Sequence, residues 1–328
     1  MTTPLLEVRD LRVEFPHRRG TLRALDGVSF DIAAGEVLGV VGESGAGKSL
    51  TGAAIIGLLD PPGRVCGGEI LLEGRRIDDL PPARMRELRG RRIGAIFQDP
   101  LTSLNPLYTV GRQLVETLRT RLGLAPAAAR ERAIDLLRQT GIPAPEARLG
   151  QYPHEFSGGM RQRVVIALAL AAEPKLIIAD EPTTALDVVV QAQIIALLRR
   201  LTQAHGAAVM LITHDMGVIA ETCDRVAVMY AGRVVEIGPV AEVIHRPAHP
   251  YTAGLMASVP SLGDDEGARL AQIEGALPRL DAMPPGCPFH PRCPKASSRC
   301  AAERPELALV ERTRAACWWP LAAGEALR

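Results

Sequence analysis

The stretch GESGAGKS, residues 42–49, constrains the fold of this chain more than any other. It fits the pattern G-x-x-x-x-G-K-[ST] and lies between an apolar, strand-like run at 36–42 and a helix expected to begin near Lys48. Glycines let a backbone curl until several N–H groups point at phosphate oxygens, and the end of a following helix adds positive potential. The stretch predicts a nucleotide-phosphate site of the P-loop kind. A chance glycine-rich turn is the alternative, and the loop alone leaves the class of nucleotide hydrolase open.

Apolar runs and helical patterns alternate along the chain. The runs at 175–180 and 208–214 lack polar alternation, 134–142 has helical periodicity with a glycine stop, and 225–238 resembles a hairpin that turns at Ala231 and Gly232. Buried strands separated by helices predict an α/β domain with a mainly parallel sheet. A hydrophobic content of 47% with only 3% aromatic residues predicts a core of aliphatic side chains and alanine.

Length and charge exclude several classes of protein. A chain of 328 residues suits one large domain, or one with an appendage, and a net charge of +1 gives no support for bulk binding to nucleic acid or anionic membranes. The arginine-rich run at 84–92 is interpreted as a solvated helix face.

The longest apolar run, 164–172, is about half of a membrane span, and the N-terminus lacks a secretory apolar region. We therefore expect a cytosolic chain, in which stable disulfides are disfavoured.

Two adjacent carboxylates end the apolar run LIIADEP at 176–182. Asp180 is the expected partner of Mg²⁺, and Glu181 is placed to polarise an attacking water. Adjacent acids at a strand end are also common as solvated loop charges, and the P-loop upstream favours the functional interpretation. His214, which ends another apolar run, is a candidate contact of the γ-phosphate, although a strand-end histidine is often structural.

The stretch FSGGMRQR, residues 156–163, decides the class. In this order and spacing the chain resembles the ATP-binding cassette (ABC) family of ATPases. The resemblance implies that Ser157, Gly158, Gly159 and Met160 begin a helix that closes over ATP held by the P-loop of a partner cassette. Met160 stands where the commonest version of the motif has glutamine, and the serine and glycines carry the phosphate contacts.

The resemblance also assigns roles to further residues. It implies catalytic roles for Glu181, His214, Lys48 and Gln98, Mg²⁺ binding by Ser49, Gln98 and Asp180, and communication across the cassette dimer by Asp187, in the segment 185–187. The implied nucleotide-binding residues are Phe15, Gly42, Glu43, Ser44, Gly45, Ala46, Gly47, Lys48, Ser49, Leu50 and Asp180. Phe15 is the candidate that stacks on adenine. Core packing of Phe15, with His17 or Arg19 stacking instead, is the alternative.

Finer similarity narrows the function. The stretches IFQDPLTSLNPLYTVG, ADEPTTALDVVVQAQI and HRPAHPYTAGLMASVP resemble the ATPases of oligopeptide and dipeptide importers, whose tails carry an H-P-Y-T element, here at 249–252. This implies a P-loop ABC cassette with a mixed sheet, a RecA-like core and a helical subdomain at about 98–170. The cassette is expected at 5–255, and a small irregular, cysteine-rich C-terminal extension at 256–328.

The same resemblance implies partners and a location. The partners are a second ABC ATPase subunit in a heterodimer, two transmembrane permease subunits and an extracytoplasmic substrate-binding protein, with no nucleic acid. The chain would lie at the cytoplasmic face of the plasma membrane and use ATP and Mg²⁺. A nickel importer, a soluble ABC ATPase acting on nucleic acid or translation, and a redox sensor that uses the cysteine tail are the alternative functions.

Four cysteines in the tail, Cys287, Cys293, Cys300 and Cys317, form a separate group. Paired knuckles typical of zinc sites are absent, and disulfides conflict with a cytosolic ATPase. Four thiolates suit a 4Fe–4S cluster in number, although the spacing matches neither common ferredoxin pattern. Some of the importer tails carry such clusters, so a cluster is the expectation, with zinc and unligated thiols as alternatives. Cys66 and Cys223 are interpreted as packing residues.

Overall fold

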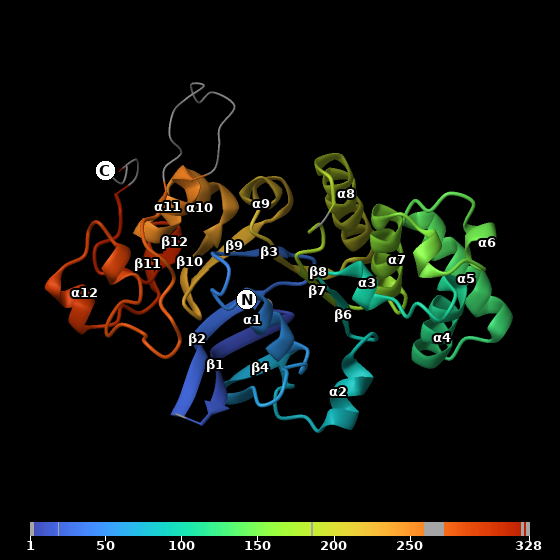
Figure 1. The fold of residues 1–328 in the computed structure, drawn as a ribbon, viewed down its shortest axis with the longest axis horizontal. Coiled ribbons are helices and arrows are strands. Elements are labelled where there is room, and N and C mark those ends of the chain that lie inside the picture. Colours follow the sequence, from blue (N-terminus) through green and yellow to red (C-terminus); the bar gives the residue numbers. More distant parts are fainter. Residues whose placement is uncertain (1–2, 19, 185, 259–271, 323–324, 326–328) are drawn as a thin grey trace. The chain divides into compact units, whose positions relative to one another are not determined.

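A computed structural model of the chain describes residues 3–18, 20–184, 186–258, 272–322 and 325 (Figure 1). Arg19, an alternative candidate for adenine stacking, lies outside these residues. The chain divides into two compact units that interleave in sequence. Unit 1 comprises residues 1–6, 32–37 and 72–212, and unit 2 comprises residues 7–31, 38–71 and 213–328. Each unit is described by itself.

Unit 1 contains a parallel sheet and most of the helices. Strands β6, β7 and β8 pair in parallel, with Ile93 beside Leu176 and Ile177 beside Val209. The two predicted apolar runs are therefore confirmed as strands β7 and β8. The elements of unit 1 are β5 (Arg75–Arg76), α2 (Pro82–Leu88), β6 (Ile93–Ile96), α3 (Pro100–Ser103), α4 (Val110–Leu122), α5 (Pro126–Gln139), α6 (Pro145–Arg148), η1 (Pro153–Glu155), α7 (Gly158–Leu170), β7 (Leu176–Asp180), α8 (Val188–His205) and β8 (Ala208–Ile212).

The helices α4 to α7 gather at one side of unit 1, drawn in green in Figure 1. Helix α5 begins at Pro126, earlier than the sequence pattern showed, and ends before Gly141, which has a positive φ of 76°. A glycine at this position suits the left-handed conformation that commonly ends a helix. The arginine-rich run is only partly helical, because α2 ends at Leu88. Met85 is the one buried residue of α2, so the predicted solvated helix face is confirmed for the helical part of the run.

Unit 2 contains the P-loop and the residues that follow β8. Strand β1 lies between β2 and β4, and a second set of strands runs in the order β11-β12-β10-β9-β3. The elements of unit 2 are β1 (Leu6–His17), β2 (Gly20–Ile32), β3 (Val37–Val41), α1 (Lys48–Ile55), β4 (Arg64–Leu72), α9 (Met216–Thr222), β9 (Arg225–Tyr230), β10 (Arg233–Pro239), α10 (Val240–His245), α11 (Pro250–Ala257), η2 (His290–Arg292), α12 (Ser298–Ala302), β11 (Ala308–Val310) and β12 (Thr313–Ala315).

The strands next to the P-loop form as the sequence indicates. Strand β3 is buried throughout and pairs in parallel with β9, while β9 and β10 form the predicted antiparallel hairpin. Ala231 and Gly232, at its turn, have φ values of 48° and 76°. Parallel and antiparallel pairs together make the mixed sheet that was expected.

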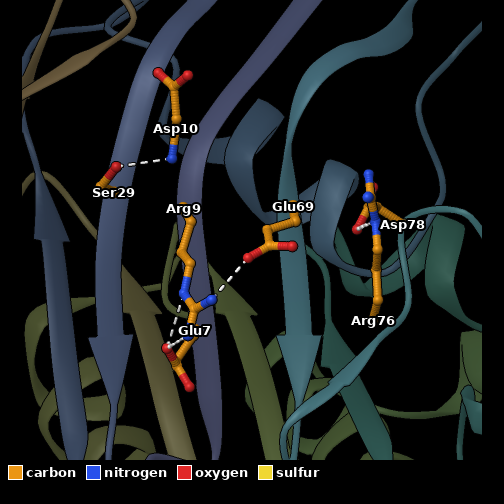
Figure 2. Close-up of polar contacts among 7 residues, drawn as sticks. All are labelled: Glu7, Arg9, Asp10, Ser29, Glu69, Arg76 and Asp78. Carbon is orange, nitrogen blue, oxygen red and sulfur yellow. Dashed lines mark hydrogen bonds and ion pairs between the residues drawn. The ribbon is translucent and has the colours of Figure 1, made fainter.

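Exposed ion pairs link neighbouring strands of the sheet that contains β1 and β4. Figure 2 shows Arg9 of β1 between two carboxylates, Glu7 on its own strand and Glu69 on β4. Such exposed pairs contribute little to the free energy of unfolding, so burial of apolar side chains carries most of the stability.

The described residues after Ala257 join unit 2 instead of forming the small irregular extension that was expected at 256–328. Strand β12 pairs with β10, with Glu236 opposite Ala315, and thus extends the sheet of unit 2. Three aromatic rings also pack edge to face, with centroids 4.7 to 5.4 Å apart: Tyr230 of β9, Tyr251 of α11 and Phe289. In a chain with few aromatic residues, these contacts supply the apolar burial that the short apolar runs of the tail lack.

A buried carboxylate organises the H-P-Y-T element. Glu236 is fully buried and accepts hydrogen bonds from the N–H groups of Ala248 and His249, at 2.8 and 2.9 Å. His249 caps α11, because its Nδ1 accepts from the N–H of Tyr251 at 3.0 Å. Burial lowers the pKa of His249 to about 3, so the ring is neutral and this nitrogen can accept.

Burial raises the pKa of Glu236 above its ordinary value. The folded-state pKa therefore lies above the unfolded one. The contribution of Glu236 to stability is fully present below the unfolded pKa and declines as the pH rises through the folded value.

Replacing Glu236 with glutamine should lower the free energy of unfolding by about 1 to 3 kcal/mol, because an amide NH₂ would face one of the two backbone donors. Urea denaturation at constant pH measures this loss. Glu303→Gln, at an exposed glutamate paired with Arg299, is the matched control and should leave the midpoint unchanged. Equal midpoints for Glu236→Gln and the unsubstituted chain would contradict the capping role.

Candidate nucleotide site

The P-loop of unit 2 has a backbone that only glycine suits at two positions. Gly42 has a φ of 148°, and a Cβ added there would lie 2.2 Å from the carbonyl oxygen of Met229. Gly47 has a φ of 102°, and its Cβ would lie 2.7 Å from a methyl group of Leu25. The sequence pattern therefore reflects both conformation and close packing against β9 and β2.

Lys48 begins α1 and is 6% exposed. Its Nζ donates to the carbonyl oxygens of Gly42 and Glu43, at 2.8 and 3.1 Å. The ammonium group is thus held inside the curve of the loop, where its charge can act on bound phosphates. Ser44, Gly45 and Ser49 are exposed at the surface of unit 2, as groups that contact a ligand must be.

Two residues that sequence reasoning missed hold Glu43, the second residue of the loop. The phenol oxygen of Tyr251 accepts from the N–H of Glu43 at 2.9 Å, and the Arg292 guanidinium contacts the Glu43 carboxylate at 3.0 and 3.1 Å. The sequence separations, 208 and 249 residues, leave no local pattern that could have revealed these contacts. The H-P-Y-T element supplies the tyrosine and was the one available signal.

Other predicted residues of unit 2 have clear positions. Ala46 is fully buried and Leu50 partly so, which makes both of them packing residues of the loop and of α1. Phe15 is partly buried, and its ring lies against Gly63, where an added Cβ would be 2.6 Å away. His214 is exposed just before α9. Adenine stacking by Phe15 and a phosphate contact of His214 remain predictions.

The carboxylates belong to unit 1, where the structure brings Gln98 and Glu181 together. Gln98 Nε2 donates to Glu181 Oε2 at 3.2 Å, and Thr184 Oγ1 donates to the same oxygen at 2.8 Å. Glu181 has a φ of 45°, a left-handed conformation that is costly for a residue with a side chain. Asp180 ends β7 directly before it. Two neighbours thus fix the direction of the Glu181 carboxylate, and sequence reasoning had named only one of them.

The signature stretch lies at the start of α7 in unit 1. Ser157 is the N-cap, and its side chain accepts from the N–H of Met160 at 3.4 Å. Ser157 and Gly158 are exposed, while a Cβ on Gly159 would lie 2.7 Å from Cγ1 of Val190 in α8. The glycine therefore permits close packing of α7 on α8, and the open helix end suits an anion.

Asp187 caps α8, because its carboxylate accepts from the N–H of Val190 at 3.0 Å. Asp187 thus has a local structural role, which neither supports nor opposes communication across a dimer. Ala185, in the predicted communication segment, lies outside the described residues.

The tail cysteines converge, but the structure does not support the predicted 4Fe–4S site. Cys287, Cys293, Cys300 and Cys317 line one cavity of unit 2 together with Phe289 and Trp318. Among the described residues, no group of three or more His, Cys, Asp or Glu side chains is arranged to hold a metal ion. Burial raises the pKa of Cys317 to about 11 and also raises those of Cys287 and Cys293, so these thiols are neutral in the metal-free protein.

Two parts of the chain match known protein families. Residues 25–184 match the family described as ABC transporter, and residues 235–300 match the one described as oligopeptide/dipeptide transporter, C-terminal region. The chain is 48% identical over 318 residues to the dipeptide transport ATP-binding protein DppD of Escherichia coli, covering 97% of each chain. It is 50% identical over 317 residues to the oligopeptide transport ATP-binding protein OppD of Salmonella typhimurium, covering 97% of this chain and 94% of that protein.

The chain belongs to the oligopeptide/dipeptide branch of the ABC transporter ATPases. The fold agrees with solved cassettes of the family. It matches the ATP-binding cassette MJ0796 bound to ADP and phosphate with a TM-score of 0.65 and 28% identity, over 72% of this chain and 98% of that one. It matches CbiO1 of Clostridium perfringens with a TM-score of 0.63 and 32% identity, over 74% of this chain and 91% of that one. Membership makes the chain an ATPase subunit and confirms the predicted class.

Substitution of Gly159 tests the packing of the ABC signature helix. We expect Gly159→Ala to lower the free energy of unfolding by about 1 to 3 kcal/mol, because its methyl group would overlap Val190. Val190→Ala in the same chain should restore most of the loss, which a double-mutant cycle in urea measures. Additive losses in the double variant would contradict the direct contact.

Reactivity of the thiols tests the packing of the tail. Cys66 is exposed, so its interpretation as a packing residue was wrong, whereas Cys287 and Cys300 are buried. Limited alkylation of the native ABC ATPase at about pH 8 should label Cys66 before the four tail cysteines, since the accessibility of each thiol sets the rate. Mass spectrometry of peptides locates the label, and an unfolded sample provides the control. Early labelling of Cys287 or Cys300 would contradict the burial.

Proposed function

We propose that this chain is the ATP-hydrolysing subunit of an importer of dipeptides or oligopeptides. The supporting observation is identity of about half of all residues with DppD and OppD over nearly the full length, including the C-terminal region. Relatives named for peptides do not favour a nickel importer, an ATPase acting on nucleic acid or translation, or a redox sensor. The functional division into a cassette at 5–255 and a C-terminal region at 256–328 belongs to this proposal.

The proposal includes a second, different cassette as partner. The exposed N-terminus of α7 supports a partner cassette of either kind, because the first N–H groups of a helix can bind a phosphate presented by another chain. Val188 and Val189, directly after Asp187, are 82% and 67% exposed, which suits a contact surface. In this arrangement ATP lies between the P-loop of one cassette and residues 157–160 of the other, and Asp187 lies at the junction.

Two permease subunits and an extracytoplasmic binding protein complete the proposed complex. Support for the permease contact comes from the segment around Gln98, where Phe97, Leu101 and Leu107 are 44%, 59% and 79% exposed. Apolar side chains grouped on a surface mark interaction sites. No helix in the described part of the chain is long and apolar enough to cross a bilayer. We therefore propose attachment to the cytoplasmic face of the membrane through the permeases.

The proposed chemistry assigns one task to each polar side chain. Glu181, whose carboxylate is held by Gln98 and Thr184, orients the water that attacks the γ-phosphate. His214 contacts the γ-phosphate, and Lys48 stabilises charge that develops on it. Ser49, Asp180 and Gln98 are the residues that would hold Mg²⁺, which supplies neutralisation of phosphate charge. Phe15 stacks on the adenine.

Replacing Glu181 with glutamine tests the catalytic assignment. In the complex with permeases and partner cassette, we expect turnover of ATP to fall by about a hundredfold or more, because the amide cannot accept a proton. Affinity for ATP should change little, since the same side-chain shape remains. Glu146→Gln, at an exposed glutamate of α6, is the control. Near-normal turnover by Glu181→Gln would remove Glu181 from the mechanism.

Uptake assays distinguish the cargo. In a strain that lacks this chain, the unsubstituted chain should restore uptake of labelled dipeptides and leave nickel uptake unchanged, while Lys48→Ala should restore neither. Recovery of nickel uptake alone would overturn the peptide assignment and leave the ATPase intact.

A further inference from the structure

Glu43 is held at each of its polar groups. Its N–H donates to Tyr251 at 2.9 Å, its carbonyl oxygen accepts from Lys48 at 3.1 Å, and its carboxylate accepts from Arg292 at 3.0 and 3.1 Å. Only the lysine belongs to the P-loop pattern. The other two partners come from the C-terminal part of unit 2, so this part of the chain fixes the entry of the loop.

Arg292 is itself firmly placed. Its side chain is 7% exposed, and its guanidinium donates to the carbonyl oxygens of Glu274 at 2.8 Å and Ile273 at 3.2 Å. It also donates to the phenol oxygen of Tyr230 at 3.3 Å. A planar group with several fixed acceptors holds its carboxylate partner in one geometry.

The same segment reaches the tip of the loop. A Cβ added to Gly45 would lie 3.4 Å from a methyl group of Leu277, which is ordinary contact distance. Residues 273–277 thus lie near the P-loop, with Arg292 anchoring one end of the segment and Leu277 next to Gly45.

The charge of Glu43 makes this anchor functionally important. A carboxylate on the P-loop repels the phosphates that the loop binds, and the repulsion is strong where water is scarce. The Arg292 guanidinium neutralises it at contact distance. Although partial burial opposes the charge on Arg292, the hydrogen bonds to Glu43 and Tyr230 raise its pKa above the ordinary value, so the cation persists.

We propose that Arg292 is a positioning residue of the nucleotide site, through which the C-terminal region holds Glu43, cancels its charge and sets the affinity of the P-loop for ATP. Arg292 acts through Glu43 and does not contact the nucleotide. This inference rests on ATP binding by the family and is independent of the transported cargo.

Calorimetric titration of the full chain with a non-hydrolysable ATP analogue and Mg²⁺ tests the proposal. Arg292→Ala should raise the Kd by about tenfold, because one uncompensated charge then faces the phosphates. The increase in Kd should be smaller for ADP, which carries less negative charge, and should become smaller as salt is added. Arg292→Lys keeps the charge and should lie closer to the unsubstituted chain.

Rescue separates this role from simple packing. In the Arg292→Ala chain, adding Glu43→Gln should return the Kd to within about threefold of the original value, because the repelling charge is gone. The single Glu43→Gln variant completes the double-mutant cycle. Glu43→Gln does not restore the hydrogen bonds that Arg292 makes to Ile273 and Glu274. A purely structural role of Arg292 therefore predicts no rescue of the Kd.

Arg279→Ala is the matched control. Arg279 lies in the same region, pairs with Asp281 and is 81% exposed, so its loss should leave the Kd unchanged. An unchanged Kd in Arg292→Ala, a weakened Kd without rescue by Glu43→Gln, or an equal effect of Arg279→Ala would overturn the proposal. Failure of the unsubstituted chain to restore peptide uptake would count against the proposed cargo and not against the role of Arg292, because these affinities are measured without permeases.

Discussion

A loop that binds phosphate must turn its own backbone N–H groups toward the ligand and must also keep that backbone in one conformation. The P-loop solves the first requirement with glycines, and Gly42 leaves no room for a Cβ against the Met229 carbonyl. Residues outside the loop help to meet the second requirement, a fixed backbone conformation. In unit 2 the support comes from β9, from α11 through Tyr251, and from the C-terminal region through Arg292. The loop's shape is therefore a property of tertiary structure as much as of its motif.

Sequence reasoning found the parts whose signals are local. Continuous apolar runs predicted β3, β7 and β8, because the sequence signal of a strand buried on both faces is an unbroken apolar run. Ala231-Gly232 predicted a turn, because glycine readily adopts the positive φ that the turn requires. The order of the short motifs along the chain predicted the family, because each motif can be recognised from neighbouring residues alone. By contrast, Arg292 and Glu43 are 249 residues apart, and no periodicity marks either of them as a partner.

The tail shows how a correct residue list can still give a wrong organisation. Proline and short apolar runs suggested an irregular appendage, while four cysteines and the resemblance to importer tails suggested a metal cluster. The structure instead completes the tail with β12 on β10 and with Phe289 against Tyr230 and Tyr251. Pairing with an existing strand and packing of scarce aromatic rings depend on distant residues, so the composition of the tail could not reveal them. The four thiols do meet, which their clustering in the sequence had indicated.

A similar limit applies to Glu181. Its identity follows from the strand end and the P-loop upstream, but its left-handed backbone and its contacts with Gln98 and Thr184 do not. A side chain on a strained backbone keeps its direction only when neighbours hold it, and the cost is of order 1 to 3 kcal/mol. Such strain suits a carboxylate that must meet a water in one orientation.

Contacts between the P-loop and the C-terminal region have a reciprocal consequence. If Arg292 and Tyr251 favour the loop conformation that binds ATP, then bound ATP must favour the packing of Arg292 and Tyr251 by the same free energy. The matched C-terminal family region, residues 235–300, contains both of these residues, along with Glu236, which fixes the start of α11. The region therefore need not contact nucleotide to respond to it. Under the proposed role of Arg292, the conformational stability of this region would rise when the loop is occupied, because both share the backbone and carboxylate of Glu43.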